Sequence, residues 1–162
     1  MTEMTLVDTA PRRTAVIHRR VRPRDLPAFL GGAFDTVAAA VARQDTHVTG
    51  PPVTVYRALS GDEFEVEAGF PVATEISADG AVVPGELPGG RAVEAIHIGP
   101  YETLASTYRK IQEWTRQQGL HPAPLMWESY LTDPEDPAHR HEDGPRTLVV
   151  QPVEPDPIVI QR

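Results

Sequence analysis

The stretch Met126-Trp127-Glu128-Ser129-Tyr130 is apolar and aromatic, as is typical of a buried β-strand, but it carries a carboxylate at its centre. Successive side chains of a strand point to opposite faces of the sheet, so Met126, Glu128 and Tyr130 share one face and Trp127 and Ser129 share the other. An ionised carboxylate without a partner among apolar side chains costs several kcal/mol. Glu128 therefore either lies at a sheet edge or beside an arginine, or it lies in a pocket that awaits a cationic, hydrogen-bonding or electrophilic ligand.

The residues around this strand predict a strand, a helix and two further strands. Alternating and β-branched residues favour a strand over residues 91–98. The helix that follows is predicted to open at Pro100 and to close at Gly119, because proline suits the first helical position and glycine a helix end. A last strand is predicted over residues 147–152.

The same order of elements occurs once before in the chain. Strands are predicted over residues 14–21, 53–56 and 64–70, and a helix over residues 26 to about 44. Val53-Thr54-Val55-Tyr56 corresponds to the strand of Glu128, with a neutral residue at the position of the carboxylate. The sequence therefore predicts two similar halves, about 14–72 and 91–153, related by a pseudo-two-fold axis, and a ligand groove on that axis.

The remaining residues are predicted to lie outside the two halves. Residues 1–13 have no helical or strand period and are expected to form a disordered leader before a domain that spans residues 14–162. Residues 71–90 are rich in glycine and proline and are expected to connect the halves.

The composition limits the classes of function. The chain has 162 residues and a mass of 17.7 kDa, which fits one domain, and it has no cysteine for a disulfide, a thiolate metal site or a Cys nucleophile. A net charge of −8 argues against direct nucleic-acid binding. No stretch has the length of a membrane span or a signal peptide, so we expect a soluble, cytoplasmic protein. One basic cluster is interpreted as solvated surface, and it comprises Arg12, Arg13, Arg19, Arg20, Arg22 and Arg24.

Several motifs together resemble the GyrI-like small-molecule-binding family, whose domain also forms the effector-binding part of drug-responsive transcription regulators such as BmrR and Rob. The resemblance spans roughly residues 14–153 and is most specific in the second half. The motifs that carry it are His97-Ile98-Gly99-Pro100-Tyr101-Glu102, Trp114, Gly119-Leu120, Trp127-Glu128-Ser129-Tyr130 with Asp133-Pro134, and Thr147 with Gln151-Pro152-Val153.

The resemblance implies an α+β fold, a duplicated β-α-β-β module in which an antiparallel sheet packs against two main helices. It also implies that Glu128 matches the acidic pocket residue that receives lipophilic cations in the regulators. Tyr56 and Tyr130 end equivalent strands and are the candidate pocket walls, because aromatic faces attract cations. Further candidate ligand contacts, some of which fit the core equally well, are Phe34, Phe70, Tyr101, Tyr108, Trp114, Met126 and Trp127.

Three functions remain open at this point. The first is a stand-alone protein that captures hydrophobic, aromatic and often cationic compounds, favoured because no helix-turn-helix segment precedes residue 14. The second, implied by the resemblance, is a hydrolase of electrophilic cyclopropane-containing natural products, with Glu128 as general base and Tyr130 or Tyr101 steadying the developing phenolate. The third is a gyrase-interacting inhibitor protein.

No cofactor or metal is predicted, and the oligomeric state is left open. Histidines and carboxylates occur together in residues 133–143, but we interpret this proline-containing stretch as a solvated loop. His18 and His97 occupy equivalent strand positions and are expected to have structural roles.

Overall fold

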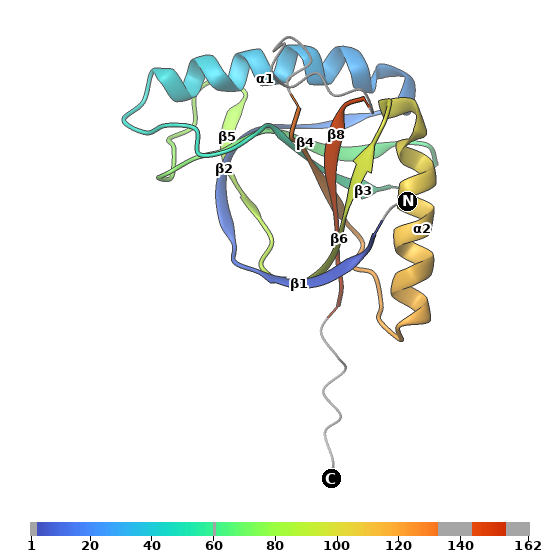
Figure 1. The fold of residues 1–162 in the computed structure, drawn as a ribbon. Coiled ribbons are helices and arrows are strands. Elements are labelled where there is room, and N and C mark those ends of the chain that lie inside the picture. The colour runs from blue at the N-terminus through green and yellow to red at the C-terminus, as the bar shows by residue number, and fades with distance from the viewer. Residues whose placement is uncertain (1–2, 60, 133–143, 155–162) are drawn as a thin grey trace.

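A computed structural model describes residues 3–59, 61–132 and 144–154 of the chain. Within these residues, eight strands form one antiparallel sheet in the order β1-β6-β8-β7-β3-β4-β2-β5, and two α-helices pack against it (Figure 1). The elements are β1 Thr5–Thr9, β2 Arg12–Val21, η1 Pro23–Asp25, α1 Leu26–Ala42, β3 Val53–Ala58, β4 Phe64–Pro71, β5 Val82–Leu87, β6 Gly90–Ile98, η2 Tyr101–Thr103, α2 Leu104–Gln117, β7 Met126–Tyr130 and β8 Arg146–Pro152.

The predicted α+β fold with a duplicated β-α-β-β module is confirmed. The first module consists of β2, α1, β3 and β4, and the second consists of β6, α2, β7 and β8. Their strands lie in mirrored order, and β3 and β7 pair at the centre of the sheet. Thr54 and Glu128 correspond in the repeat and are also direct cross-strand partners. A pseudo-two-fold axis that exchanges the modules therefore passes between Thr54 and Glu128.

Residues 1–13 were predicted to form a disordered leader, and this prediction is wrong for the described residues 3–13, most of which belong to two strands. β1 runs antiparallel to β6, with Leu6 opposite Val93 and Val7 opposite Ala92, and β2 already begins at Arg12. A five-residue edge strand gives too short a pattern to be recognised locally, and its partner lies in the other half of the chain.

The predicted connection over residues 71–90 likewise contains a strand, β5, which pairs with β2. β1 precedes β2 but pairs with β6, and β5 precedes β6 but pairs with β2. Each repeat is therefore one strand longer than predicted, and the two repeats exchange their first strands.

Both helices cover the same face of the sheet. α1 buries Ala33 and Val37 on the strands of the first module, and α2 buries Leu104 and Ile111 on those of the second. Directly paired residues share a face. One such row runs across six strands from the core under α1 to the core under α2, namely Ile17, Ala68, Thr54, Glu128, Val149 and Ala95.

The opposite face of the curved sheet carries a second core. Trp127 is buried there between its cross-strand partners Val55 and Val150, with Leu87 of β5 and Ala92 of β6 in the same cluster. The central strands are therefore buried on both faces, which explains why the stretch around Glu128 is almost continuously apolar.

The segment Pro23–Ala42 has the length and, with a mean hydropathy of 1.2, the composition of a membrane-spanning helix. Within the described structure, Val37, Ala40 and Val41 from this segment are buried against the sheet. The exposed residues Ala28, Ala38 and Ala39 add to the mean hydropathy, while the opposite side of the segment packs on the sheet.

Replacing Gly32 with alanine is expected to stabilise the protein by about 0.5–1 kcal/mol, because glycine in a helix interior loses more backbone entropy on folding. A Cβ atom at Gly32 would meet no atom within 4 Å. The thermal unfolding midpoint should rise by about 1–4 °C. The matched control is Gly80→Ala, where φ is +61° and alanine is strained, so the midpoint should fall.

Candidate functional site

Glu128 lies at the centre of the molecule, on β7 between β3 and β8. Only 3% of its surface is exposed, and its cross-strand partner Thr54 is fully buried. Both side chains point to the face that carries the helices, on the pseudo-two-fold axis between α1 and α2. Glu128 is therefore neither at a sheet edge nor open to solvent.

Three tyrosine hydroxyl groups converge on this carboxylate. Tyr56 of β3 donates a hydrogen bond to Oε1 at 2.8 Å, and Tyr130 of β7 donates to the same oxygen at 2.5 Å. Tyr108 of α2 donates to Oε2. The Tyr130 oxygen also lies 2.9 Å from Oγ1 of Thr54. An ionised carboxylate has only acceptor sites, so three hydroxyl donors from three elements suit it well.

The same environment keeps the three phenols protonated. Burial, and then the nearby negative charge of Glu128, raise the pKa values of Tyr56, Tyr108 and Tyr130 far above the ordinary value for tyrosine. All three therefore remain hydrogen-bond donors throughout the neutral pH range.

No cationic side chain among the described residues lies within ion-pair distance of Glu128. Within the described ranges, the ion pairs join His18 to Glu65 and Arg43 to Asp79. None of these four residues lies on β3 or β7, the strands that carry Thr54 and Glu128. Burying a carboxylate with hydrogen-bond donors but without a counter-charge leaves its charge uncompensated in a medium of low dielectric constant. Within the described residues, the site therefore offers Glu128 three hydrogen-bond donors and no cationic side chain.

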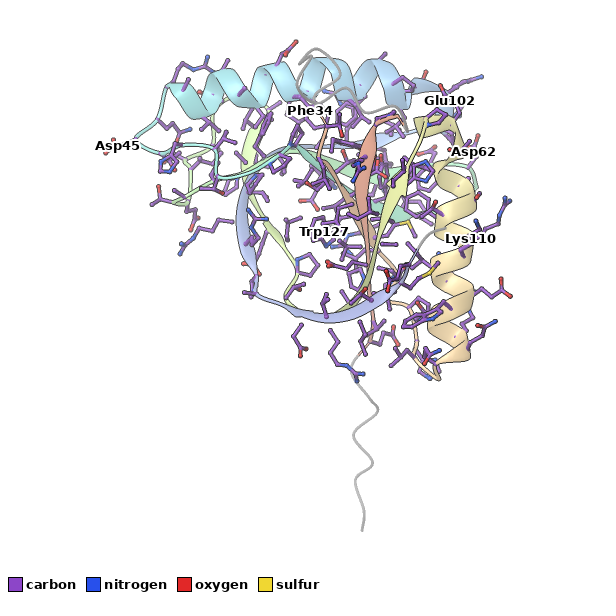
Figure 2. All side chains as sticks on the ribbon, viewed as in Figure 1. Phe34, Asp45, Asp62, Glu102, Lys110 and Trp127 are labelled. Carbon is purple, nitrogen blue, oxygen red and sulfur yellow. The ribbon has the colours of Figure 1, made fainter. Side chains whose placement is uncertain are left out.

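Two further predicted contacts lie beside the tyrosines. The ring of Phe34 on α1 packs edge-on against Tyr130 with 5.8 Å between centroids, and against Phe70 of β4 at 6.0 Å. Met126 is opposite Tyr56 on the same face of the sheet. Phe34 lies beneath α1 in Figure 2. The site thus combines one carboxylate with aromatic side chains from both helices and both central strands.

The structure does not bring the other candidates to Glu128. Trp127 lies on the opposite face, within the curve of the sheet (Figure 2), and Trp114 packs in the core between α2 and the second module. The side chain of Tyr101 and the whole of residues 133–143 lie outside the described part of the chain.

Two site residues were missed by sequence reasoning. Thr54 contacts Tyr130, and its correspondence to Glu128 in the repeat was a signal that could have found it. Thr147 is fully buried opposite Tyr130 on β8, and its Oγ1 makes no hydrogen bond to any of the described residues. The sequence singles out Thr147 as part of the family resemblance, but only the pairing of β7 with β8 places it beside Tyr130.

The two strand histidines have different surroundings. His97 is buried, with Nδ1 2.6 Å from Oγ1 of Thr107 and Nε2 3.1 Å from the carbonyl oxygen of Pro100. These contacts tie β6 to the start of the second helical segment. His18 is exposed and lies 2.5 Å from Glu65. Neither belongs to a cluster of metal-ligating side chains within the described ranges.

The chain belongs to the GyrI-like family, because the sequence profile of the GyrI-like small molecule binding domain matches residues 2–145. That match includes β1, which agrees with its place in the sheet. None of the curated proteins is similar enough in sequence to match this chain.

Solved structures with low sequence identity share the fold. EcmrR in its complex with DNA is 19% identical with a TM-score of 0.75, and the match covers 94% of this chain but 57% of that one. A hydrolase from Listeria innocua is 12% identical with a TM-score of 0.58, covering 94% and 92%. SAV2435 bound to tetraphenylphosphonium is 8% identical with a TM-score of 0.64, covering 94% of both chains. This chain therefore spans somewhat more than half the length of EcmrR.

Proposed function

We propose that this protein captures hydrophobic aromatic cations at Glu128, as a cytoplasmic multidrug-binding protein that protects by sequestration or senses the compounds. The observation that carries the proposal is the buried carboxylate, which has three phenol donors and no cationic partner among the described residues. A lipophilic cation supplies the missing positive charge and pays a smaller desolvation cost than a lysine or an arginine, since its charge is spread over an apolar body.

The aromatic side chains suit the same ligand. A cation against the face of a tyrosine or phenylalanine ring gains about 0.5–2 kcal/mol, depending on how well water is excluded. Tyr56, Tyr130 and Phe34 approach the axis from both modules, so a flat or propeller-shaped aromatic cation can contact several rings at once. The binding of tetraphenylphosphonium by SAV2435, which shares this fold, supports the proposal.

Entry of a ligand requires the site to open. Glu128 is 3% exposed and is covered by the three tyrosine side chains, so an aromatic cation must displace at least one of them. Tyr108 is the only one of the three that a helix supplies, and the helix can shift without breaking the pairing of β3 with β7. We infer that the ligand enters beside α2.

The test uses two probes of the same shape and opposite charge. A cationic rhodamine dye is bound to the protein, and tetraphenylphosphonium or tetraphenylborate is added while fluorescence anisotropy is measured. Tetraphenylphosphonium should displace the dye at micromolar concentration, and tetraphenylborate should need at least about tenfold more, because only the cation is attracted by Glu128. Equal displacement by both ions would mean that the site selects for apolar shape alone.

Hydrolysis is the second candidate function. The high pKa values of the tyrosines keep them protonated, so each could donate to a developing phenolate while Glu128 activates water. Capture leaves a cyclopropane-containing electrophile chemically unchanged, whereas hydrolysis consumes it, and chromatography of an incubated mixture distinguishes the two. The gyrase-interacting alternative stays a prediction.

A further inference from the structure

Thr147 of β8 has a buried hydroxyl group that the described part of the protein does not use. The residue is fully buried, and its Oγ1 makes no hydrogen bond to any of the described residues. A buried polar atom without a partner destabilises a protein, and valine has nearly the same shape without this cost. The hydroxyl group at this position therefore points to a partner that comes from outside the described residues.

Both polar neighbours of Thr147 direct their hydrogen bonds elsewhere. Thr147 is the direct cross-strand partner of Tyr130 on β7 and of His97 on β6. The hydroxyl group of Tyr130 donates to Oε1 of Glu128 at 2.5 Å. Both ring nitrogens of His97 face hydrogen-bonding atoms of the second helical segment, with Nδ1 2.6 Å from Oγ1 of Thr107. The hydroxyl group of Thr147 thus lies between two polar side chains whose bonds are already made.

Thr147 lies on the same face of the sheet as Glu128. Val149 is the cross-strand partner of Glu128, and Thr147 is two residues before it on β8, so Thr147 and Glu128 are diagonal neighbours. The Cβ atoms of diagonal neighbours are roughly 7 Å apart. α2 covers this part of the sheet and packs Leu104 and Ile111 in one cluster with Val149. A ligand that enters beside α2 and reaches Glu128 therefore has Thr147 beside it.

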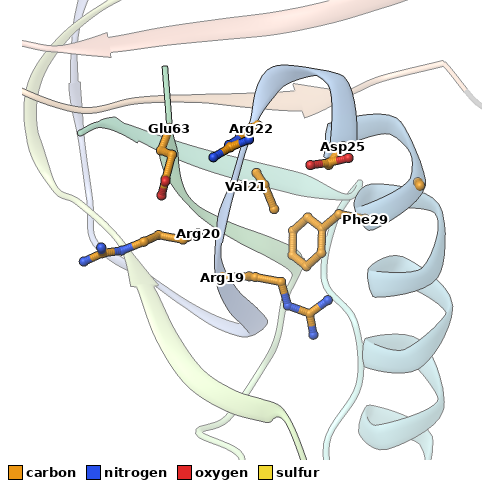
Figure 3. Close-up of a pocket in the computed structure, with 8 residues that line it drawn as sticks. Arg19, Arg20, Val21, Arg22, Asp25, Phe29 and Glu63 are labelled. Carbon is orange, nitrogen blue, oxygen red and sulfur yellow. The ribbon is translucent and has the colours of Figure 1, made fainter. Parts of the chain in front are cut away.

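The surface hollow where β2 ends differs from this interior. Figure 3 shows Arg19, Arg20 and Arg22 around that hollow, with the ring of Phe29 at one side. All three arginines are exposed, and Arg20 is the cross-strand partner of Glu65. Water and a carboxylate on the neighbouring strand satisfy such side chains without a ligand, whereas Thr147 is closed off from solvent.

We propose that Thr147 is a specificity-determining residue of the cation site, an inference that rests on the proposed function. Its hydroxyl group forms a hydrogen bond with a polar substituent of the bound cation, as either donor or acceptor. The separation of Thr147 from Glu128 suits an aromatic ring with the positive centre at one end and an amino, hydroxyl or ether group at the other. The site therefore accepts aminoaryl and related cations that a wholly apolar pocket would disfavour.

The test is isothermal titration calorimetry of the full chain with tetraphenylphosphonium and two derivatives. (4-Aminophenyl)triphenylphosphonium carries a neutral hydrogen-bonding group, and (4-methylphenyl)triphenylphosphonium carries a methyl group of similar size at the same position. Thr147→Val should lower the ratio of the amino affinity to the methyl affinity by about threefold to tenfold, since the bound amino group then lacks a partner. Thr147→Ser keeps the hydroxyl group and should retain the wild-type ratio.

The matched control is Thr115→Val. Thr115 of α2 is also fully buried, but its Oγ1 already donates to the carbonyl oxygen of Ile111 at 2.6 Å. This variant should keep the wild-type ratio and lower the thermal unfolding midpoint, because it loses a hydrogen bond. Thr147→Val should instead raise the midpoint by about 2–6 °C, because it removes an unpaired polar atom.

The inference is overturned if Thr147→Val keeps the wild-type ratio, or if Thr115→Val lowers it equally, because the hydroxyl group of Thr147 then does not contact the ligand. Tetraphenylphosphonium has no hydrogen-bonding group and separates this failure from that of the proposed function. If Glu128→Gln weakens its binding while the ratio is the same in Thr147→Val and the wild type, only the inference about Thr147 fails. If the wild type does not bind tetraphenylphosphonium, the proposed function and this inference both fail.

Discussion

Glu128→Gln is expected to lower the affinity of the protein for tetraphenylphosphonium by about tenfold to a hundredfold, which is the largest effect that we expect on binding. Glutamine has nearly the same shape as glutamate, and its carbonyl oxygen still accepts hydrogen bonds from Tyr56 and Tyr130. The substitution therefore removes the negative charge and keeps most of the packing. Calorimetric titration of both proteins at the same ionic strength measures the difference.

The matched control for this variant is Glu67→Gln. Glu67 lies on β4 opposite Val55, on the face of the sheet that does not carry the helices. The same change in net charge at Glu67 should leave the affinity within about twofold of the wild type, since water screens a distant charge. If both variants lose affinity equally, the cation responds to the overall charge of the protein and Glu128 is not its partner. If neither loses affinity, binding depends on apolar contacts alone.

Part of the site could be predicted from the sequence because it depends on local periodicity and on the repeat. The two-residue period of a strand places Glu128 and Tyr130 on one face, and the correspondence of the strands adds Tyr56. Tyr108 was ambiguous between core and pocket. A helical period gives the face that is buried but not the strands that this face meets, and only the packing of α2 places Tyr108 at Glu128.

The fold beyond the two modules could not be predicted for a related reason. β1 and β5 each pair with a strand of the other repeat, and no local pattern specifies a partner so far away in the chain. The double burial of β7 was equally hidden. Trp127 is among the predicted ligand contacts, but β1, β5 and β6 contribute side chains that cover the face on which it lies.

Gly69→Ala is expected to destabilise the protein by about 3 kcal/mol, which is the largest effect on stability that we expect. A Cβ atom at Gly69 would lie 1.9 Å from the carbonyl oxygen of Ala15 and 2.9 Å from Cα of Val16, both of them backbone atoms of β2. Backbone atoms inside a paired strand cannot rotate away, so β2 and β4 must separate. The thermal unfolding midpoint should fall by about 6–12 °C.

The effect of Gly69→Ala should also reach the cation site. Gly69 pairs with Val53 on β3, and the next pair along joins Ala68 to Thr54. Separation of β2 from β4 therefore disturbs the strand that supplies Thr54 and Tyr56. We expect weaker binding of tetraphenylphosphonium by Gly69→Ala even at temperatures where the variant is folded, whereas Gly32→Ala, on the outer side of α1, should bind as the wild type does. If Gly69→Ala were as stable as the wild type, the register between β2 and β4 would be wrong. The placement of Thr54 beside Glu128 rests on the pairing of β3 with β7, so it would stand even then.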